Sequence, residues 1–148
     1  MRDTSKFVSA ALLVLVALLL TFKLKAALGW SPDVLLPILA VAGFFLDIYA
    51  LAFLVLLTVW VLNWQTGLPV EMLVLAAAPC AAWLGKRFLP AVPWLTLAAV
   101  ILAGEVALYA LGDASILLGN LGFIISNVVF ALLFGLSLMA LLEWAYEK

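Results

Sequence analysis

Five polar residues interrupt long apolar stretches of the chain, and their side chains are the ones whose types could support chemistry. They are Asp47, Glu71, Glu105, Asn120 and Asn127. A carboxyl group in hydrocarbon must be protonated, pair with another group or face water, so ionisable residues at such depth are functional candidates. Amide side chains in the same setting form hydrogen bonds between helices.

Glu105 is the most informative of the five, because no basic residue lies in the same apolar stretch. Either it is a neutral acid that is hydrogen-bonded to Asn127 or to a backbone carbonyl, or it lines a polar cavity. Asn120 and Asn127 can share one face of a helix and would line that cavity with Glu105. Glu71 is expected in the first turn of a helix, where negative charge is favourable. Asp47 is expected in a turn, because a carboxylate at the bilayer centre costs about 2.5–3.5 kcal/mol.

The rest of the sequence argues against catalysis. The chain has no histidine and a single cysteine, Cys80, which excludes a histidine-based triad, an internal disulfide and most zinc sites. We find no nucleophile beside a base, no metal-binding cluster and no glycine-rich phosphate loop. We therefore expect no enzymatic activity, no metal and no cofactor, and we expect Cys80 to pack among the alanines around it.

The composition decides the class of protein. Of 148 residues, 70% are hydrophobic and only 10% are charged, whereas a soluble domain is about 45–50% apolar and about 25% charged. So few charges cannot cover a water-exposed surface, and so much apolar mass excludes disorder. Seven basic residues against eight acidic ones leave no electrostatic footprint for nucleic acid. The expected partner is therefore the lipid bilayer, and the expected class an all-α integral membrane bundle.

The elements that must position these residues follow from the apolar runs. We expect one domain, residues 1–148, with transmembrane helices at about 6–25, 32–46, 48–63, 69–84, 93–111 and 116–144. A spanning helix needs about 20 residues, so six helices leave only very short loops. Gly43 followed by aromatic residues, together with Asp47, favours a break between 46 and 48, which lets Asp47 reach the headgroups. An unbroken helix over 34–62 would give five spans, and this alternative stays open.

The basic residues orient the bundle, because they concentrate on the cytoplasmic side of a membrane protein. Six spans place five of them on one side, namely Arg2, Lys6, Lys86, Arg87 and Lys148, against Lys23 and Lys25 on the other. Five spans again give five against two. Both counts put the Lys86-Arg87 loop and the carboxy terminus in the cytoplasm, and they leave the side of the amino terminus open.

Small residues recur at four-residue spacing on three of the expected helices, including Gly122 with Ser126 and Ala131 with Gly135 on the sixth. Ala99, Ala103 and Ala107 share one face of the fifth helix, and Ala78 and Ala82 share a face of the fourth. Such faces let helix backbones approach closely in lipid. They serve either packing inside the bundle or docking of a partner's membrane helix.

At this point the pattern resembles small bacterial membrane proteins of the rod shape-determining MreD type. The similar features are a retained amino-terminal helix, a Pro-Asp-led second helix, a Gly-Leu-Pro turn and a last helix with an internal asparagine. In this sequence they are Pro32-Asp33-Val34-Leu35-Leu36-Pro37 with the run ending Gly43-Phe44-Phe45-Leu46-Asp47, the turn Thr66-Gly67-Leu68-Pro69, and Asn127. The resemblance implies five or six spans and a non-enzymatic scaffold of the bacterial cytoplasmic membrane. Such a scaffold would bind the membrane helix of an MreC-like partner and help to organise the wall-elongation machinery that sets cell shape.

The chain is also similar to the substrate-binding components of energy-coupling vitamin transporters. That likeness implies a ligand cavity and small-residue faces that dock a coupling protein, which would make the chain a transport component. A third hypothesis is an accessory subunit of a larger membrane complex. The sequence leaves the small-molecule ligand, the partner and the oligomeric state open.

Overall fold

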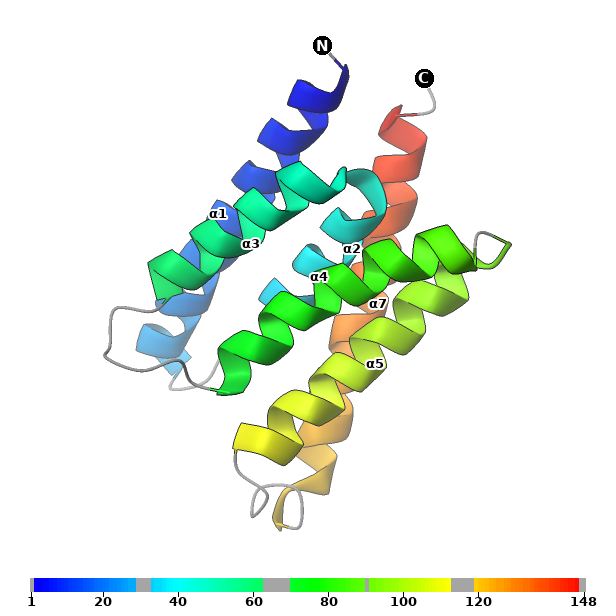
Figure 1. Ribbon diagram of the computed structural model, residues 1–148. Coiled ribbons are helices and arrows are strands. Elements are labelled where there is room, and N and C mark those ends of the chain that lie inside the picture. The colour runs from blue at the N-terminus through cyan, green and yellow to red at the C-terminus, as the bar shows by residue number, and fades with distance from the viewer. Residues whose placement is uncertain (1, 29–32, 63–69, 90, 113–118, 147–148) are drawn as a thin grey trace.

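The computed structural model describes residues 2–28, 33–62, 70–89, 91–112 and 119–146 (Figure 1). Those residues form six helices and no strand. In chain order the helices are α1 (Arg2–Leu28), α2 (Leu35–Phe45), α3 (Ile48–Leu62), α4 (Val70–Phe88), α5 (Pro93–Gly112) and α7 (Leu121–Tyr146). The expected all-α class is confirmed for this part of the chain. The expected start of the last helix, at 116, falls outside the described residues.

The second apolar run breaks where its only charge lies. The backbone turns extended at Leu46, whose N–H donates to the carbonyl oxygen of Ala42 at 2.9 Å. The exposed Asp47 follows, and its own carbonyl accepts the N–H of Leu51 at 2.9 Å as α3 begins. The break expected near Asp47 is therefore confirmed, and an unbroken helix over 34–62 is wrong.

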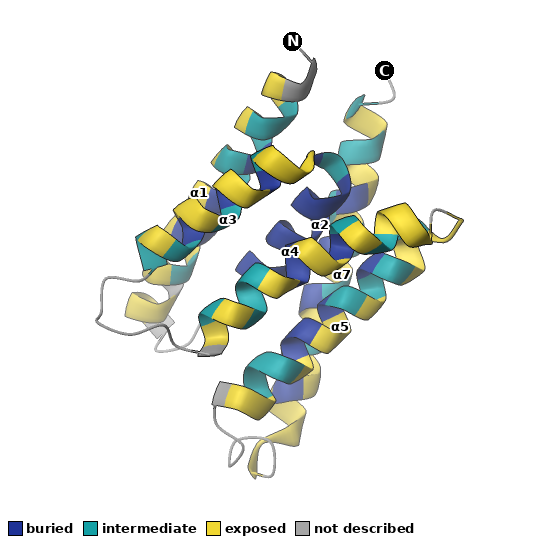
Figure 2. Cartoon of the chain, viewed as in Figure 1, coloured by how far each residue is buried: buried dark blue, intermediate teal, exposed yellow. Residues whose placement is uncertain are grey.

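Helix α2 forms the centre of the bundle. It is only 11 residues long, which gives a length of about 16 Å at 1.5 Å per residue. All of its residues from Leu35 to Phe44 are buried, and it packs against α1, α4, α5 and α7. Figure 2 shows it as the dark core among helices that are exposed on their outer faces.

Glycines permit close contacts of α4 with α2 and with α5. A Cβ at Gly43 of α2 would meet the carbonyl oxygen of Pro79 and lie 3.0 Å from the Cβ of Ala82, both on α4. At Gly85 of α4, a Cβ would collide with the methyl group of Thr96 on α5. The expected end of the fourth helix near residue 84 is wrong, since α4 continues through Gly85 to Phe88. Gly85 serves close packing against α5 rather than termination.

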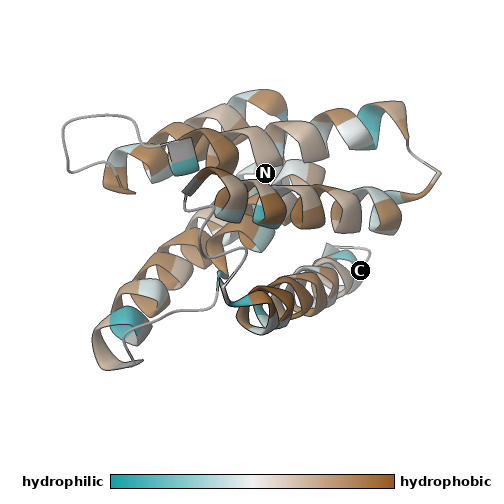
Figure 3. Cartoon of the chain, turned by 90° about the horizontal axis from the view of Figure 1, so that it is seen from below, coloured by the Kyte–Doolittle hydropathy of each residue, from teal (hydrophilic) through white to brown (hydrophobic). Residues whose placement is uncertain are grey.

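The outer surface of the bundle is apolar. Within the described part of the chain, three helical segments are long and apolar enough to cross a membrane: Thr4–Ala27, Pro93–Leu111 and Leu121–Tyr146. Large side chains such as Leu12, Phe53 and Leu133 are more than half exposed on the outside of the bundle. Figure 3, which shows the molecule from below, has mostly hydrophobic colour over the helices with scattered hydrophilic patches. This surface suits hydrocarbon rather than water.

The start of α1, the end of α7, Lys6 and Lys86 all lie at one end of the bundle. The Nζ atom of Lys6, near the start of α1, lies 5.7 Å from the ring centroid of Tyr146 at the end of α7. The Nζ atom of Lys86 donates to the carbonyl oxygen of Phe44 at the end of α2. Figure 1 shows the two termini and the α2–α3 turn at this same end. The six-helix order thus brings Lys6 and Lys86 to one side, as expected.

Candidate functional site

Glu105 is the most deeply buried ionisable residue that the structure describes. It lies on α5 and has 0% of its surface exposed. Neither of its carboxyl oxygens has a hydrogen-bond partner among the described residues. Its neighbour Gly104 packs against the side chain of Leu36, which places this part of α5 beside the first turn of α2.

The start of α2 supplies a second carboxyl group. Asp33 is half-buried just before the helix, and its Oδ1 accepts the N–H of Leu36 at 3.3 Å. The carboxyl groups of Asp33 and Glu105 are close enough to repel each other electrostatically. Two acidic groups therefore lie near the amino-terminal end of α2, one on either side of Leu36.

A hydrogen bond between α5 and α7 completes this polar cluster. The Nδ2 atom of the buried Asn127 donates to the hydroxyl oxygen of Tyr109 at 2.6 Å. Tyr109 lies one turn after Glu105 on α5 and also interacts electrostatically with Glu105 and Asp33. The expected hydrogen bond between Glu105 and Asn127 is wrong, because Asn127 pairs with Tyr109 instead. We call Asp33, Glu105, Tyr109 and Asn127 the acidic cluster.

The other three polar candidates lie outside this cluster. Asn120 is exposed immediately before α7, where its carbonyl oxygen accepts the N–H groups of Phe123 and Ile124. Asn120 is exposed, whereas Glu105 and Asn127 are buried, and the cavity expected to be lined by all three stays a prediction. Glu71 is exposed in the first turn of α4 and Asp47 is exposed in the α2–α3 turn, both as expected.

Sequence reasoning missed two members of the acidic cluster. Tyr109 follows Glu105 by one helical turn, so its spacing placed it on the same face of α5. Asp33 was assigned only to the start of a helix, where it does lie. The sequence carried no signal that the start of α2 is inserted into the bundle beside α5.

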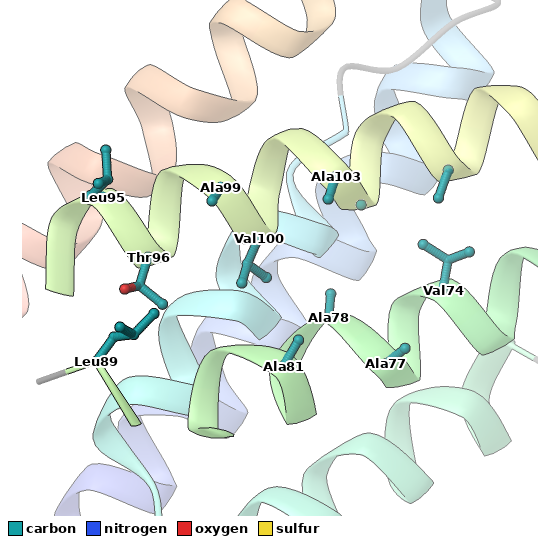
Figure 4. Close-up of a pocket in the computed structure, with 12 residues that line it drawn as sticks. Val74, Ala77, Ala78, Ala81, Leu89, Leu95, Thr96, Ala99, Val100 and Ala103 are labelled. Carbon is teal, nitrogen blue, oxygen red and sulfur yellow. The ribbon is translucent and has the colours of Figure 1, made fainter. Parts of the chain in front are cut away.

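A second feature is an apolar groove between α4 and α5, with a volume of about 480 Å³. Its lining is made of small and aliphatic side chains with one hydroxyl, as Figure 4 shows. The small residues are Ala77, Ala78, Ala81, Thr96, Ala99, Ala103, Gly104 and Ala107. The hydroxyl of Thr96 donates to the carbonyl oxygen of Val92 on its own helix at 3.0 Å, so that hydrogen is already used.

The two expected alanine faces have different surroundings. Ala99 and Ala103 are exposed along the groove, and Ala107 lines it while half-buried. Ala82 is fully buried against α2 beside Gly43, whereas Ala78 is buried and lines the edge of the groove. Cys80 is exposed on α4, so the expectation that it packs among its neighbours is wrong. It lies on a face of α4 that no described helix covers.

The chain matches no protein-family model, no curated protein and no solved structure. Its class therefore rests on its own architecture. The described residues form an all-helical bundle with an apolar exterior and three helices able to cross a membrane.

Proposed function

We propose that this protein is a non-enzymatic, multi-pass scaffold of the bacterial cell envelope that holds a partner's membrane helix in the α4–α5 groove. The observation that carries this proposal is the groove itself, a hollow lined mostly by small side chains on a surface that also exposes many large apolar ones. In this account all six helices lie in the cytoplasmic membrane. The end that carries Lys6 and Lys86 faces the cytoplasm, by the bias of basic residues.

The association of helices in lipid depends on how closely their surfaces fit. Lipid tails are as apolar as leucine, so helices associate through close van der Waals packing rather than through the hydrophobic effect. The exposed Ala77 and Ala81 on one wall of the groove and Ala99 and Ala103 on the other leave room for a guest backbone. A rigid helix whose side chains fill this groove gains contacts that flexible lipid chains do not supply as well.

The proposed occupant is a single apolar helix of a partner protein of the MreC type. The groove offers no ion pair or free hydroxyl among its described lining residues, so the complementary surface must be apolar. Complementarity of shape would therefore select the partner. Through this contact the scaffold would take part in wall elongation and the control of cell shape.

The second candidate is a substrate-binding component of a vitamin-type transporter. The volume of the groove, about 480 Å³, falls within the range of about 300–1,000 Å³ that is typical of small-molecule pockets. Such pockets also carry a few polar groups that orient the ligand. The described lining of the groove lacks them, and for this reason the scaffold ranks first.

Site-specific photocrosslinking in living cells tests the docking proposal. A photoreactive residue replaces Ala103 inside the groove, and as a matched control it replaces Leu133, which is 63% exposed on the outer face of α7. We expect the position 103 probe to give one discrete protein adduct that maps to a transmembrane segment of the partner. Equal adducts from both positions, or lipid adducts alone, would count against docking in the groove.

A substitution that fills the groove separates the two candidates. Ala99→Trp should abolish the adduct from position 103 and reduce co-purification of the partner, whereas Leu133→Trp should leave both unchanged. A transport component should instead copurify with a small molecule and melt at a higher temperature when that molecule is added. A ligand-induced rise in melting temperature that Ala99→Trp abolishes would favour the second candidate.

A further inference from the structure

The acidic cluster has no role in the docking of a partner helix. Glu105 is fully buried, while the groove is formed by the neighbouring Ala103 and Ala107 on another face of α5. A buried polar atom without a hydrogen bond costs about 1–3 kcal/mol, and more when it is charged. Both carboxyl oxygens of Glu105 are in this position.

We propose that Glu105 and Asp33, together with Tyr109 and Asn127, form an intramembrane binding site for a monovalent cation, either a proton or sodium. The site lies at the amino-terminal end of α2 in the interior of the bundle. Its function would be to exchange this cation, so that the charge of the bundle interior changes with the conditions outside. The inference is independent of what occupies the α4–α5 groove.

The charges around Glu105 support this assignment. Asp33, before α2, adds a second acidic group, and Tyr109 on α5 and Asn127 on α7 are neutral. On α4, Lys86 contacts the opposite end of α2, which is about 16 Å from its start at 1.5 Å per residue. Glu71 is exposed at the far end of α4. Lys23 and Lys25, at the end of α1, are exposed, and neither is among the charges that act on Asp33 or Glu105. Two bare negative charges cannot share an apolar interior.

The end of α2 explains why one cation is sufficient. The amino-terminal end of a helix carries a partial positive charge of about +0.5 and free N–H groups. Asp33 uses this end through its contact with the N–H of Leu36. The helix end therefore offsets part of the cost of burying the charge of Asp33, and the charge of Glu105 remains for an external cation to neutralise.

The available donors define the class of ligand. Carboxyl, amide and hydroxyl oxygens are the groups that bind protons and hard cations. No group of three or more acidic, histidine or cysteine side chains is found among the described residues, so a divalent ion would lack the charge it requires. A single positive charge, together with the partial positive charge at the start of α2, balances most of the negative charge of the two carboxyl groups.

Labelling with dicyclohexylcarbodiimide tests the site, because this apolar reagent attacks protonated carboxyl groups in apolar surroundings. The purified full-length protein is reconstituted in vesicles, and the labelled residue is identified by peptide mass spectrometry. We expect Glu105 to be modified and its rate of labelling to fall as the pH rises. Glu105→Gln should remove the label, and the matched control Glu71→Gln should leave it unchanged.

The identity of the bound cation is determined by adding sodium chloride at constant pH, with choline chloride as the control. If Glu105 is labelled more slowly in sodium chloride than in choline chloride, sodium competes with the proton for the site. If the two rates are equal, the bound cation is the proton. Asp33→Asn should move the pH profile of labelling to lower pH, because a neutral amide no longer repels the negative charge on Glu105. A folded protein in which Glu105 stays unlabelled, or is labelled at a rate independent of both pH and sodium, would overturn the proposal.

Discussion

Replacing Gly43 by alanine should destabilise the bundle at the close contact between α2 and α4. The new methyl group would press on the carbonyl oxygen of Pro79 and lie 3.0 Å from the Cβ of Ala82. A backbone oxygen inside α4 cannot rotate away as the end of a long side chain can. Overpacking of this kind costs about 1–3 kcal/mol, against which alanine gains up to about 1 kcal/mol of helix propensity over glycine.

Gly122→Ala is the matched control for this substitution. Gly122 is an exposed glycine in α7, and a Cβ at that position has no atom within 4 Å. The control therefore keeps the gain in helix propensity and adds no clash. The free energy of unfolding of Gly43→Ala should lie about 1–3 kcal/mol below that of Gly122→Ala, which is the overpacking cost alone.

Reversible unfolding in mixed micelles, followed by circular dichroism as dodecyl sulfate is added, measures this difference. Both variants are compared at the same detergent composition, so that the micelle contributes equally. If Gly43→Ala is as stable as Gly122→Ala, the close approach of α2 to α4 is wrong.

Three further predictions address contacts between helices. In a double-mutant cycle, Tyr109→Phe and Asn127→Leu should show a coupling energy of about 0.6–2 kcal/mol, typical of a hydrogen bond between membrane helices; purely additive effects would mean that the bond is absent. Lys86→Met should lower the free energy of unfolding by about 0.3–1 kcal/mol, because a cation leaves the carboxy-terminal end of α2. Arg87→Met should be milder in the same assay, since Arg87 contacts the ring of Trp83 and no carbonyl of α2, and equal effects would contradict the assigned role of Lys86.

The sequence predicted helix boundaries well where residues at the boundary itself determine them. The charge of Asp47 in an apolar run marked the α2–α3 break, because a carboxylate is too costly to keep at the bilayer centre. The same local reasoning misplaced the end of α4. Glycine often ends a helix, but Gly85 is required by its contact with Thr96, and that contact is set by how α4 crosses α5.

The candidate site was predicted in part, for a similar reason. Glu105 and Asn127 were singled out because polar groups are rare inside an apolar bundle, and both are buried. Their actual neighbours depend on the depth at which α2 enters the bundle, which no periodicity in the sequence encodes. The four-residue spacing of alanines likewise identified small faces, but the crossing of α4 and α5 decides that Ala103 lines an open groove while Ala82 is buried.

Electron paramagnetic resonance at Cys80 tests the central claim, that the bundle including α4 is surrounded by hydrocarbon. Cys80 is the single cysteine of the chain and is exposed on α4, so a nitroxide can be attached to the natural sequence. In reconstituted vesicles we expect the label to collide frequently with oxygen, which concentrates in hydrocarbon, and rarely with a water-soluble nickel chelate. Frequent collision with the chelate would place α4 in water and contradict the six-helix membrane bundle.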